Sequence, residues 1–232
     1  MAQKINPTSF RLGITQLWNS NFQVYDKTFS FYTYILHEHL KVYSVLSKLF
    51  FLNGFLLNYQ EWKFDKSKVK INIFYSVVPF NDKDSKSLFF QKLPRMVNFW
   101  FFHNVYTHLY LKSSWSLSNN LLTAYSCHLL DKHVSFKKTI WSLTKFLETY
   151  LNSKKLSYYK CGVLKLKLEG FKIKISGRLD NSKNQMAKSF EQSMGYLPLT
   201  SLKSYVVFSN KKIYTKSGVC GLKVWLYYKI CN

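Results

Sequence analysis

The stretch that decides the fold lies near the carboxyl end of the chain, where residues Gly170–Leu179 read GFKIKISGRL. Apolar and polar residues alternate in it with a period of two, which is typical of a strand with one buried and one solvent face. Residues Gly218–Tyr228 read GVCGLKVWLYY and alternate in the same way. We therefore expect a sheet that buries Phe171, Ile173 and Ile175 and carries lysines among aromatics on its open face. Such a face suits a polyanionic partner.

The charge of the whole chain also points to an anionic partner. The 232 residues carry 34 basic and 11 acidic side chains, a formal net charge of +23, and residues 154–232 hold 16 of the basic and 3 of the acidic ones. Such a charge opposes compaction unless an anion neutralises it, so nucleic acid is the expected partner and an anionic membrane surface the alternative. The apolar stretches 45–59 and 93–111 contain several polar residues each, and neither resembles the ~20 apolar residues of a membrane-spanning helix. We expect no membrane partner.

Residues with catalytic or metal-binding chemistry are scattered along the chain. The four cysteines show no C-x-x-C spacing, and His37-Glu38-His39 lacks the H-E-x-x-H spacing, so we expect no metal site and no cofactor. The acidic residues do not form the carboxylate cluster of a metal-dependent nuclease, and the sequence contains no nucleophile elbow. We therefore expect a binding protein that is not an enzyme and has no small-molecule substrate.

Hydrophobic periodicity divides the chain into two α+β parts on either side of a polar run at 113–120. The elements expected in the first part are a helix at 31–53, a strand pair within 61–79, a helix at 86–98 and a strand at 106–112. Those expected in the second part are helices within 121–152, a strand at 170–178, a short polar helix near 185–193 and strands near 203–208, 212–217 and 221–229. The second part should therefore form a mostly antiparallel four-stranded sheet with helices on one face.

Two groups of residues at opposite ends of the chain carry a resemblance to a known family. The first group is Gln3-Lys4-Ile5-Asn6-Pro7, Phe10-Arg11-Leu12-Gly13-Ile14 and Trp18-Asn19-Ser20; the second is Ile175–Leu179, Ala187-Lys188, Gly195 with Leu197-Pro198-Leu199, and Gly218–Trp225. With these runs in this order, the chain resembles the S-three family of small-subunit ribosomal proteins in its bacterial-type, organellar form. The resemblance is clear over residues 1–22 and 121–229 and weak between them.

The resemblance implies three regions: a basic amino-terminal extension over 1–22, a K-homology-like domain of the prokaryotic type over 23–116, and a carboxyl-terminal S-three domain over 117–232. It implies a structural constituent of the head of the small ribosomal subunit, which binds ribosomal RNA and lines the site where messenger RNA enters. The implied protein partners are the S-ten, S-fourteen, S-four and S-five proteins. The abundance of lysine, phenylalanine, tyrosine and asparagine, which have AT-rich codons, indicates an AT-rich genome such as an organellar one. We expect a mitochondrial, organelle-encoded protein rather than a plastid one.

One loop departs from the family pattern. A K-homology domain approaches the RNA backbone with a G-x-x-G loop, but the corresponding stretch Val78–Ser85 reads VPFNDKDS and contains no glycine. Glycine permits close approach to phosphate, and Asp82 and Asp84 would repel it. We expect this domain to act as a protein-docking scaffold. The same departure argues against the alternative function, a free K-homology regulator that binds single-stranded RNA.

The candidate ribosomal RNA contacts are the two arginines of the family signatures and nearby lysines. Arginine occurs only at positions 11, 95 and 178, and arginine kept where lysine prevails suggests bidentate phosphate contact. For Arg178 the alternative is a salt bridge at the end of a strand, and the segment around Arg11 is expected to be a tail that RNA orders on binding. The expected ribosomal RNA contacts are Lys4, Arg11, Arg178, Lys183 and Lys188.

A second group of basic residues is expected to face messenger RNA. Lys137 and Lys138 stand where the family carries paired arginines at the site of messenger entry, so the resemblance implies contact with the incoming strand. Lys145 lies seven residues after Lys138 and shares its helix face, opposite the apolar stripe that begins at Ile140. A solvated helix face is the alternative interpretation of these lysines.

Overall fold

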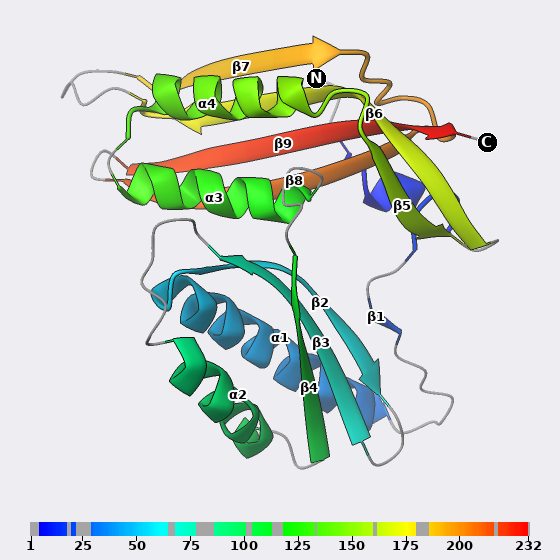
Figure 1. Cartoon of the computed structure of the whole chain (residues 1–232), viewed down its shortest axis with the longest axis vertical. Helices are drawn as coiled ribbons and strands as arrows, with labels where there is room; N and C mark the ends of the chain where they lie inside the picture. Colours follow the sequence, from blue (N-terminus) through cyan, green and yellow to red (C-terminus); the bar gives the residue numbers. More distant parts are fainter. Residues whose placement is uncertain are drawn as a thin grey trace. The chain divides into compact units, whose positions relative to one another are not determined.

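The computed structural model describes residues 5–17, 20–21, 29–64, 68–77, 86–100, 104–112, 118–132, 134–159, 162–179, 186–215 and 218–231 (Figure 1). The chain divides into two compact units. Residues 19–113 form one of them, which we call the central unit. The other, which we call the terminal unit, joins the amino-terminal segment up to residue 18 to residues 114–232.

The central unit is a four-stranded sheet with two helices packed on it. Its elements in chain order are β1 (Ser20–Asn21), α1 (Phe29–Leu52), β2 (Phe55–Phe64), β3 (Lys68–Val77), α2 (Lys86–Trp100) and β4 (Asn104–Leu111). The strand order is β1-β2-β3-β4; β2 and β3 are antiparallel, whereas β1 pairs with β2, and β4 with β3, in parallel. This α+β arrangement is consistent with the K-homology-like domain that the sequence implied.

The core of the central unit forms where a helical stripe meets alternate residues of a strand. Val42, Leu46 and Phe50 of α1 recur every four residues, about one helical turn, and are buried in the same cluster as Ile71 and Ile73 of β3. Both helices and the strands β3 and β4 were predicted, whereas β2 begins at Phe55, six residues before the expected strand pair, and β1 was not expected. The loop at 78–85 lies outside the described residues, so the inability of this loop to bind RNA stays a prediction.

The terminal unit is a five-stranded antiparallel sheet. Its elements are η1 (Ser9–Arg11), α3 (Asn119–Asp131), α4 (Phe136–Thr149), β5 (Lys154–Tyr159), β6 (Gly162–Gly177), β7 (Lys188–Gly195), β8 (Tyr205–Thr215) and β9 (Gly218–Cys231). The strand order is β5-β6-β9-β8, and β7 pairs with the second half of β6 beyond the end of β5. Helices α3 and α4 run along one face of this sheet (Figure 1).

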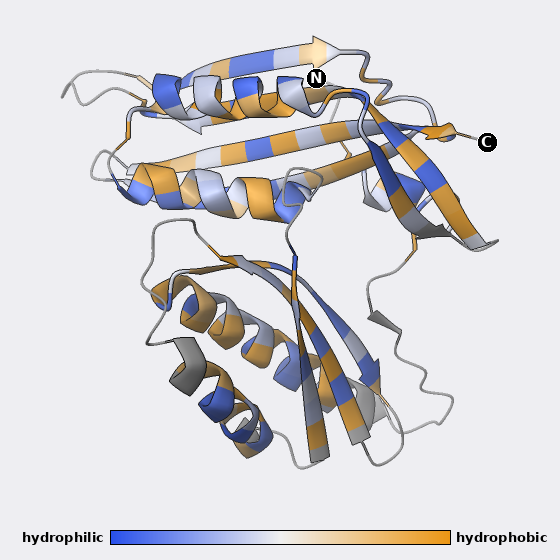
Figure 2. Cartoon of the chain, in the orientation of Figure 1, coloured by the Kyte–Doolittle hydropathy of each residue, from blue (hydrophilic) through white to orange (hydrophobic). Residues whose placement is uncertain are grey.

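The stretch Gly170–Leu179 buries alternate residues, as its sequence predicted. Phe171, Ile173 and Ile175 of β6 are fully buried in the cluster that also holds Leu143 and Leu147 of α4. The residues between them face the opposite side, and Figure 2 shows the same banding of hydrophilic and hydrophobic residues along β9. One face of the sheet is therefore the core, and the other carries the polar residues.

Two glycines let β6 and β7 approach each other at a β-bulge. The register of β6 against β9 shifts between Leu168 and Gly170, and Gly170 lies opposite Gly195 of β7. A Cβ atom on Gly195, whose φ is +74°, would lie 2.1 Å from the main-chain oxygen of Glu169. A Cβ atom on Gly170 would lie 2.2 Å from the main-chain oxygen of Tyr196. Both positions therefore require glycine for lack of space.

The sequence prediction for this sheet is wrong in three details. The short polar helix expected near 185–193 is the strand β7, whose residues are nearly all exposed, so that no apolar alternation marks it. The strands expected at 203–208 and 212–217 are one strand, β8, and β5 was not expected at all. The sheet has five strands instead of four, because pairing with β6 rather than local pattern creates its two shortest strands.

Candidate nucleic-acid interface

The face of the terminal sheet opposite α3 and α4 is rich in lysine. The register places Lys172 and Lys174 of β6 beside Trp225 and Lys223 of β9, on the side away from the buried Ile173 and Val224. The same alternation places further lysines of β5, β6, β8 and β9 on this side. We call this set the lysine face; it consists of Lys154, Lys165, Lys167, Lys172, Lys174, Lys212, Lys223 and Lys229.

Two carboxylates pair with the lysine face among the described residues. Glu191 of β7 bonds Lys172, with 2.6 Å between Nζ and Oε2, and also Lys174. Hydrogen bonds from these two lysines lower the pKa of Glu191 from 4.5 to about 2. Glu169, at the bulge, lies 3.5 Å from the Nζ of Lys229. Since eight lysines face two carboxylates, most of the positive charge on this face is not balanced by the described part of the chain.

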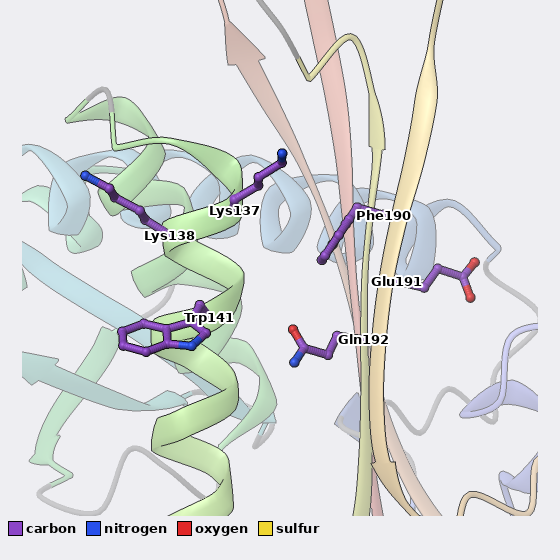
Figure 3. A pocket seen from close by; sticks show the side chains of 6 residues that line it. All are labelled: Lys137, Lys138, Trp141, Phe190, Glu191 and Gln192. Atoms are coloured by element: carbon purple, nitrogen blue, oxygen red, sulfur yellow. The ribbon is translucent and has the colours of Figure 1, made fainter.

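A second cationic site lies between α4 and the edge strand β7. A groove of about 600 Å³ is lined by residues of both elements, namely Lys137, Lys138, Trp141, Phe190, Glu191 and Gln192. Phe190 and Gln192 extend from β7 toward α4, whereas Glu191 extends away from the helix (Figure 3). Because its carboxylate pairs with Lys172 and Lys174 on the lysine face, Glu191 does not pair with Lys137 or Lys138 in the groove.

The exposed face of α4 combines lysines with one tryptophan. Lys137, Trp141 and Lys145 follow one another at intervals of four residues, so they lie along one side of the helix. Trp141 is 57% exposed, and the Nζ of Lys145 lies 3.8 Å from the centroid of its ring. Lys137 and Lys138 are exposed at the first turn. Sequence reasoning identified the three lysines but missed Trp141, although its spacing from Lys137 and Lys145 could have revealed it.

The remaining predicted RNA contacts are only partly within the described residues. Arg178 follows the end of β6 and is half-buried, and Lys188 of β7 pairs with the adjacent Gly177 and is exposed. Arg178 therefore lies one residue beyond the strand partner of Lys188. Lys4 and Lys183 lie outside the described residues. RNA contact by these four residues stays a prediction.

Arg11, in contrast, is turned into the protein. Its side chain is fully buried. Its Nε donates to the main-chain oxygen of Ser204 at 2.9 Å, its Nη1 to that of Pro7 at 2.9 Å, and its Nη2 to those of Leu199 and Ser201 at 2.9 and 2.8 Å. A buried guanidinium whose three nitrogens all donate to protein oxygens cannot reach a phosphate. The prediction that Arg11 binds ribosomal RNA is therefore wrong.

The segment around Arg11 is also not the RNA-ordered tail that the sequence suggested. Residues 5–17 contain the short helix η1, and the amide of Gly13 donates to the oxygen of Gln16 at 2.9 Å. The side-chain amide of Gln16 donates to the main-chain oxygen of Val206 in β8 at 2.6 Å. The described part of the amino-terminal segment is thus a packed element of the terminal unit.

Comparison with known proteins identifies the family of this chain. The family model of "Ribosomal protein S3, C-terminal domain" matches residues 154–226, which include the strands β5 to β8 and most of β9. The small ribosomal subunit protein uS3m of Chondrus crispus is 45% identical over 228 residues, which cover 98% of this chain and 94% of that protein. The chain belongs to the ribosomal protein S3 family. More distant relatives are uS3 of a Phytoplasma species, 27% identical over 98% of this chain and 83% of its own, and uS3c of Gracilaria tenuistipitata, 24% identical over 98% and 94%.

Membership of the S3 family gives this chain a structural role in the small ribosomal subunit. The higher identity to the mitochondrial relative than to the plastid one identifies it as the mitochondrial form, as the sequence predicted. The matches give no support to the alternative of a free K-homology regulator. In the described part of the chain, no helix is long and apolar enough to cross a membrane, and no three His, Cys, Asp or Glu side chains gather where they could hold a metal ion.

The family signatures at the two ends of this S3 chain meet in space. Arg11 belongs to the amino-terminal signature, and Pro198 and Leu199, whose oxygens accept from its Nη2 at 3.1 and 2.9 Å, belong to the carboxyl-terminal one. The sequence presented them as two separate observations. They form one structural site, which favours arginine at position 11 in a chain that otherwise uses lysine: a guanidinium spreads five N–H donors over three nitrogens, whereas an ammonium has three donors on one nitrogen.

Proposed function

We propose that the lysine face binds the phosphates of small-subunit ribosomal RNA. The observation that carries this proposal is the arrangement of eight lysines against two carboxylates on the face of the sheet that α3 and α4 do not cover. Lysines bind phosphate through charge and release the counterions condensed on RNA, which needs no base-specific geometry. Such a positively charged face is therefore suited to hold a folded RNA in place, and this contribution is architectural and requires no catalysis.

The salt dependence of RNA binding tests this proposal. The test variant replaces Lys172, Lys174 and Lys223 with glutamine. The matched control replaces Lys41, Lys48 and Lys92, exposed lysines on the helices of the central unit, and so changes the net charge equally. Binding of the full chain to small-subunit ribosomal RNA is measured over a range of salt. The slope of log K against log salt should become shallower by about 0.7–0.9 for each phosphate that the variant no longer neutralises. Equal slopes for the two triple variants would remove the lysine face from the RNA interface.

The exposed face of α4 has a second role in this proposal, contact with incoming messenger RNA. Lys137 and Lys138 are exposed at the groove beside β7, and the family resemblance assigns their positions to the site of messenger entry. In small subunits that carry Lys137→Gln with Lys138→Gln, a photoreactive messenger should crosslink to this protein less than in the wild type. An unchanged crosslinking yield would show that these lysines do not face the messenger.

The central unit fits the role of a protein-docking scaffold. On its sheet Tyr59 stacks on Phe74 with 4.3 Å between ring centroids, and Phe74 stacks on Tyr110 at 5.0 Å. Because Phe74 has a ring stacked on each of its faces, it offers no open plane to a base. The resemblance suggests S-ten and S-fourteen as partners here, and S-four and S-five near α4. Replacing Tyr110 with alanine should reduce the amounts of S-ten and S-fourteen that copurify with this protein. Unchanged amounts would exclude the surface around Tyr110 as their docking site.

A further inference from the structure

We propose that Trp141 is a stacking platform for one base of a single-stranded RNA whose phosphates lie along Lys137 and Lys138. The inference rests on the proposed messenger contact of α4 and adds to it a residue that neither the sequence nor the family resemblance singled out. It concerns single-stranded RNA only, because the base faces of a duplex are already stacked.

The first support is the exposure and position of the indole. Trp141 is 57% exposed on a helix whose opposite side, including Ile140 and Leu143, is buried in the core. Lysines stand on the turn before it and on the turn after it. Binding sites for single-stranded nucleic acid combine these two features, a positive track for the backbone and an aromatic plane for the bases.

The second support is the contact between Trp141 and Lys145. An ammonium 3.8 Å from the ring centroid lies over one face of the indole and attracts its π electrons. This contact restrains the ring on the outer surface of α4, where Figure 3 shows it extending to the side away from β7. A ring held in place loses less conformational freedom when a base stacks on it.

The third support is the groove beside the ring. Its volume of about 600 Å³ falls in the range of sites that hold small organic ligands, so it has room for a nucleotide next to the stacked one. Its far wall offers the 41% exposed ring of Phe190 and the amide of Gln192, which can donate to and accept from a base edge. Charge favours RNA over a protein partner, because three lysines of α4 flank position 141 along the helix and the Glu191 carboxylate is engaged on the other face of β7.

A binding experiment with two oligomers separates stacking from charge. The probes are a labelled oligoadenylate of about ten nucleotides and an abasic ribose-phosphate oligomer of the same length. The protein is the full chain with Lys172, Lys174 and Lys223 changed to glutamine, so that the lysine face competes less for the probe. In this background Trp141→Ala should weaken oligoadenylate binding roughly five- to one-hundred-fold, the effect of removing one base stack, and leave the abasic oligomer unchanged.

Three further variants decide between the outcomes. Trp141→Phe should retain most of the affinity, because it keeps an aromatic plane, and Tyr214→Ala, which removes a 76% exposed ring on β8, should change neither probe. The inference is overturned if Trp141→Ala leaves oligoadenylate binding unchanged or weakens both probes equally. Lys137→Gln with Lys138→Gln should weaken both probes. If that double variant has no effect, the proposed messenger contact fails, and this result is distinct from a failure of Trp141 alone.

Discussion

The Nε atom of Arg11 donates a hydrogen bond to the main-chain oxygen of Ser204, 2.9 Å away and 193 positions later in the chain. The hydroxyl of Ser204 accepts a second bond from the Nη2 of the same guanidinium at 2.9 Å. Among the described residues no carboxylate is paired with this buried cation, so main-chain carbonyls and one hydroxyl replace its hydration. One side chain thus fastens the amino-terminal segment to the loop before β8.

Replacing Arg11 with lysine should destabilise the protein although the charge is kept. An ammonium on a single stem cannot serve the oxygens of Pro7, Leu199, Ser201 and Ser204 together, and those left unpaired would be buried. We expect the free energy of unfolding to fall by about 2–4 kcal/mol, measured by urea denaturation. Arg95→Lys, at an exposed position of α2, is the matched control and should have little effect. If both variants unfold at the same urea concentration, the buried network contributes no stability.

Replacing Gly195 with alanine should cost more than the same change at Gly13. Both glycines have a similar positive φ, +74° and +80°, so a side chain strains the backbone at both, by about 1–2 kcal/mol. At Gly13 no atom lies within 4 Å of an added Cβ, whereas at Gly195 the oxygen of Glu169 lies 2.1 Å away. Separation of β7 from the bulge should add about 1–3 kcal/mol at Gly195. Thermal unfolding of the two variants measures the difference, and equal melting temperatures would contradict a packing role for Gly195.

The ion pairs of Glu191 should make stability depend on pH in the acid range. The pKa of Glu191 is about 2 in the folded protein against an ordinary value of 4.5, so the charged form is favoured by folding. A carboxyl group with a lowered pKa stabilises the fold above its unfolded pKa, and this contribution is lost as the pH falls from about 4.5 toward 2. The difference in free energy of unfolding between the wild type and Glu191→Gln should be constant from neutral pH to about pH 5 and shrink below it. A difference that stays constant down to about pH 3 would show that Glu191 is not paired.

Local pattern was enough to predict the elements that bury an apolar face. Phe171, Ile173 and Ile175 alternate as in a strand, and Val42, Leu46 and Phe50 recur as in a helix. Both patterns predict burial, and both sets lie in the cores. The strand β7 carries no such pattern, because it is an edge strand whose residues are nearly all exposed and whose two large apolar side chains, Phe190 and Met194, lie four residues apart. It exists because β6 offers hydrogen bonds along its whole length, which is a property of another segment of the chain.

The candidate site was predictable in its charges but not in its geometry. The lysines of α4 and of the terminal sheet could be predicted from composition and alternation. The burial of Arg11 could not, because its partners lie near the other end of the chain and are main-chain oxygens, which have no sequence signature. The pairing of Glu191 with Lys172 and Lys174 was equally hidden, since the register of β7 on β6 creates it. Composition predicts which residues are charged, but it does not predict which residue each charged side chain pairs with.

The pairing of Glu191 predicts that removing its charge strengthens RNA binding. In the free protein Glu191 neutralises part of the charge of Lys172 and Lys174, and phosphates must compete with it for these ammonium groups. With Glu191→Gln both lysines can pair with RNA, so affinity for small-subunit ribosomal RNA should rise, and the slope of log K against log salt should steepen by about one. The control is Glu38→Gln, which removes an equal charge, 3.1 Å from Lys41, on α1 of the central unit. General electrostatic attraction would raise the affinity of both variants equally, whereas competition on the lysine face raises that of Glu191→Gln further. Equal affinities would therefore mean that Lys172 and Lys174 do not contact the RNA.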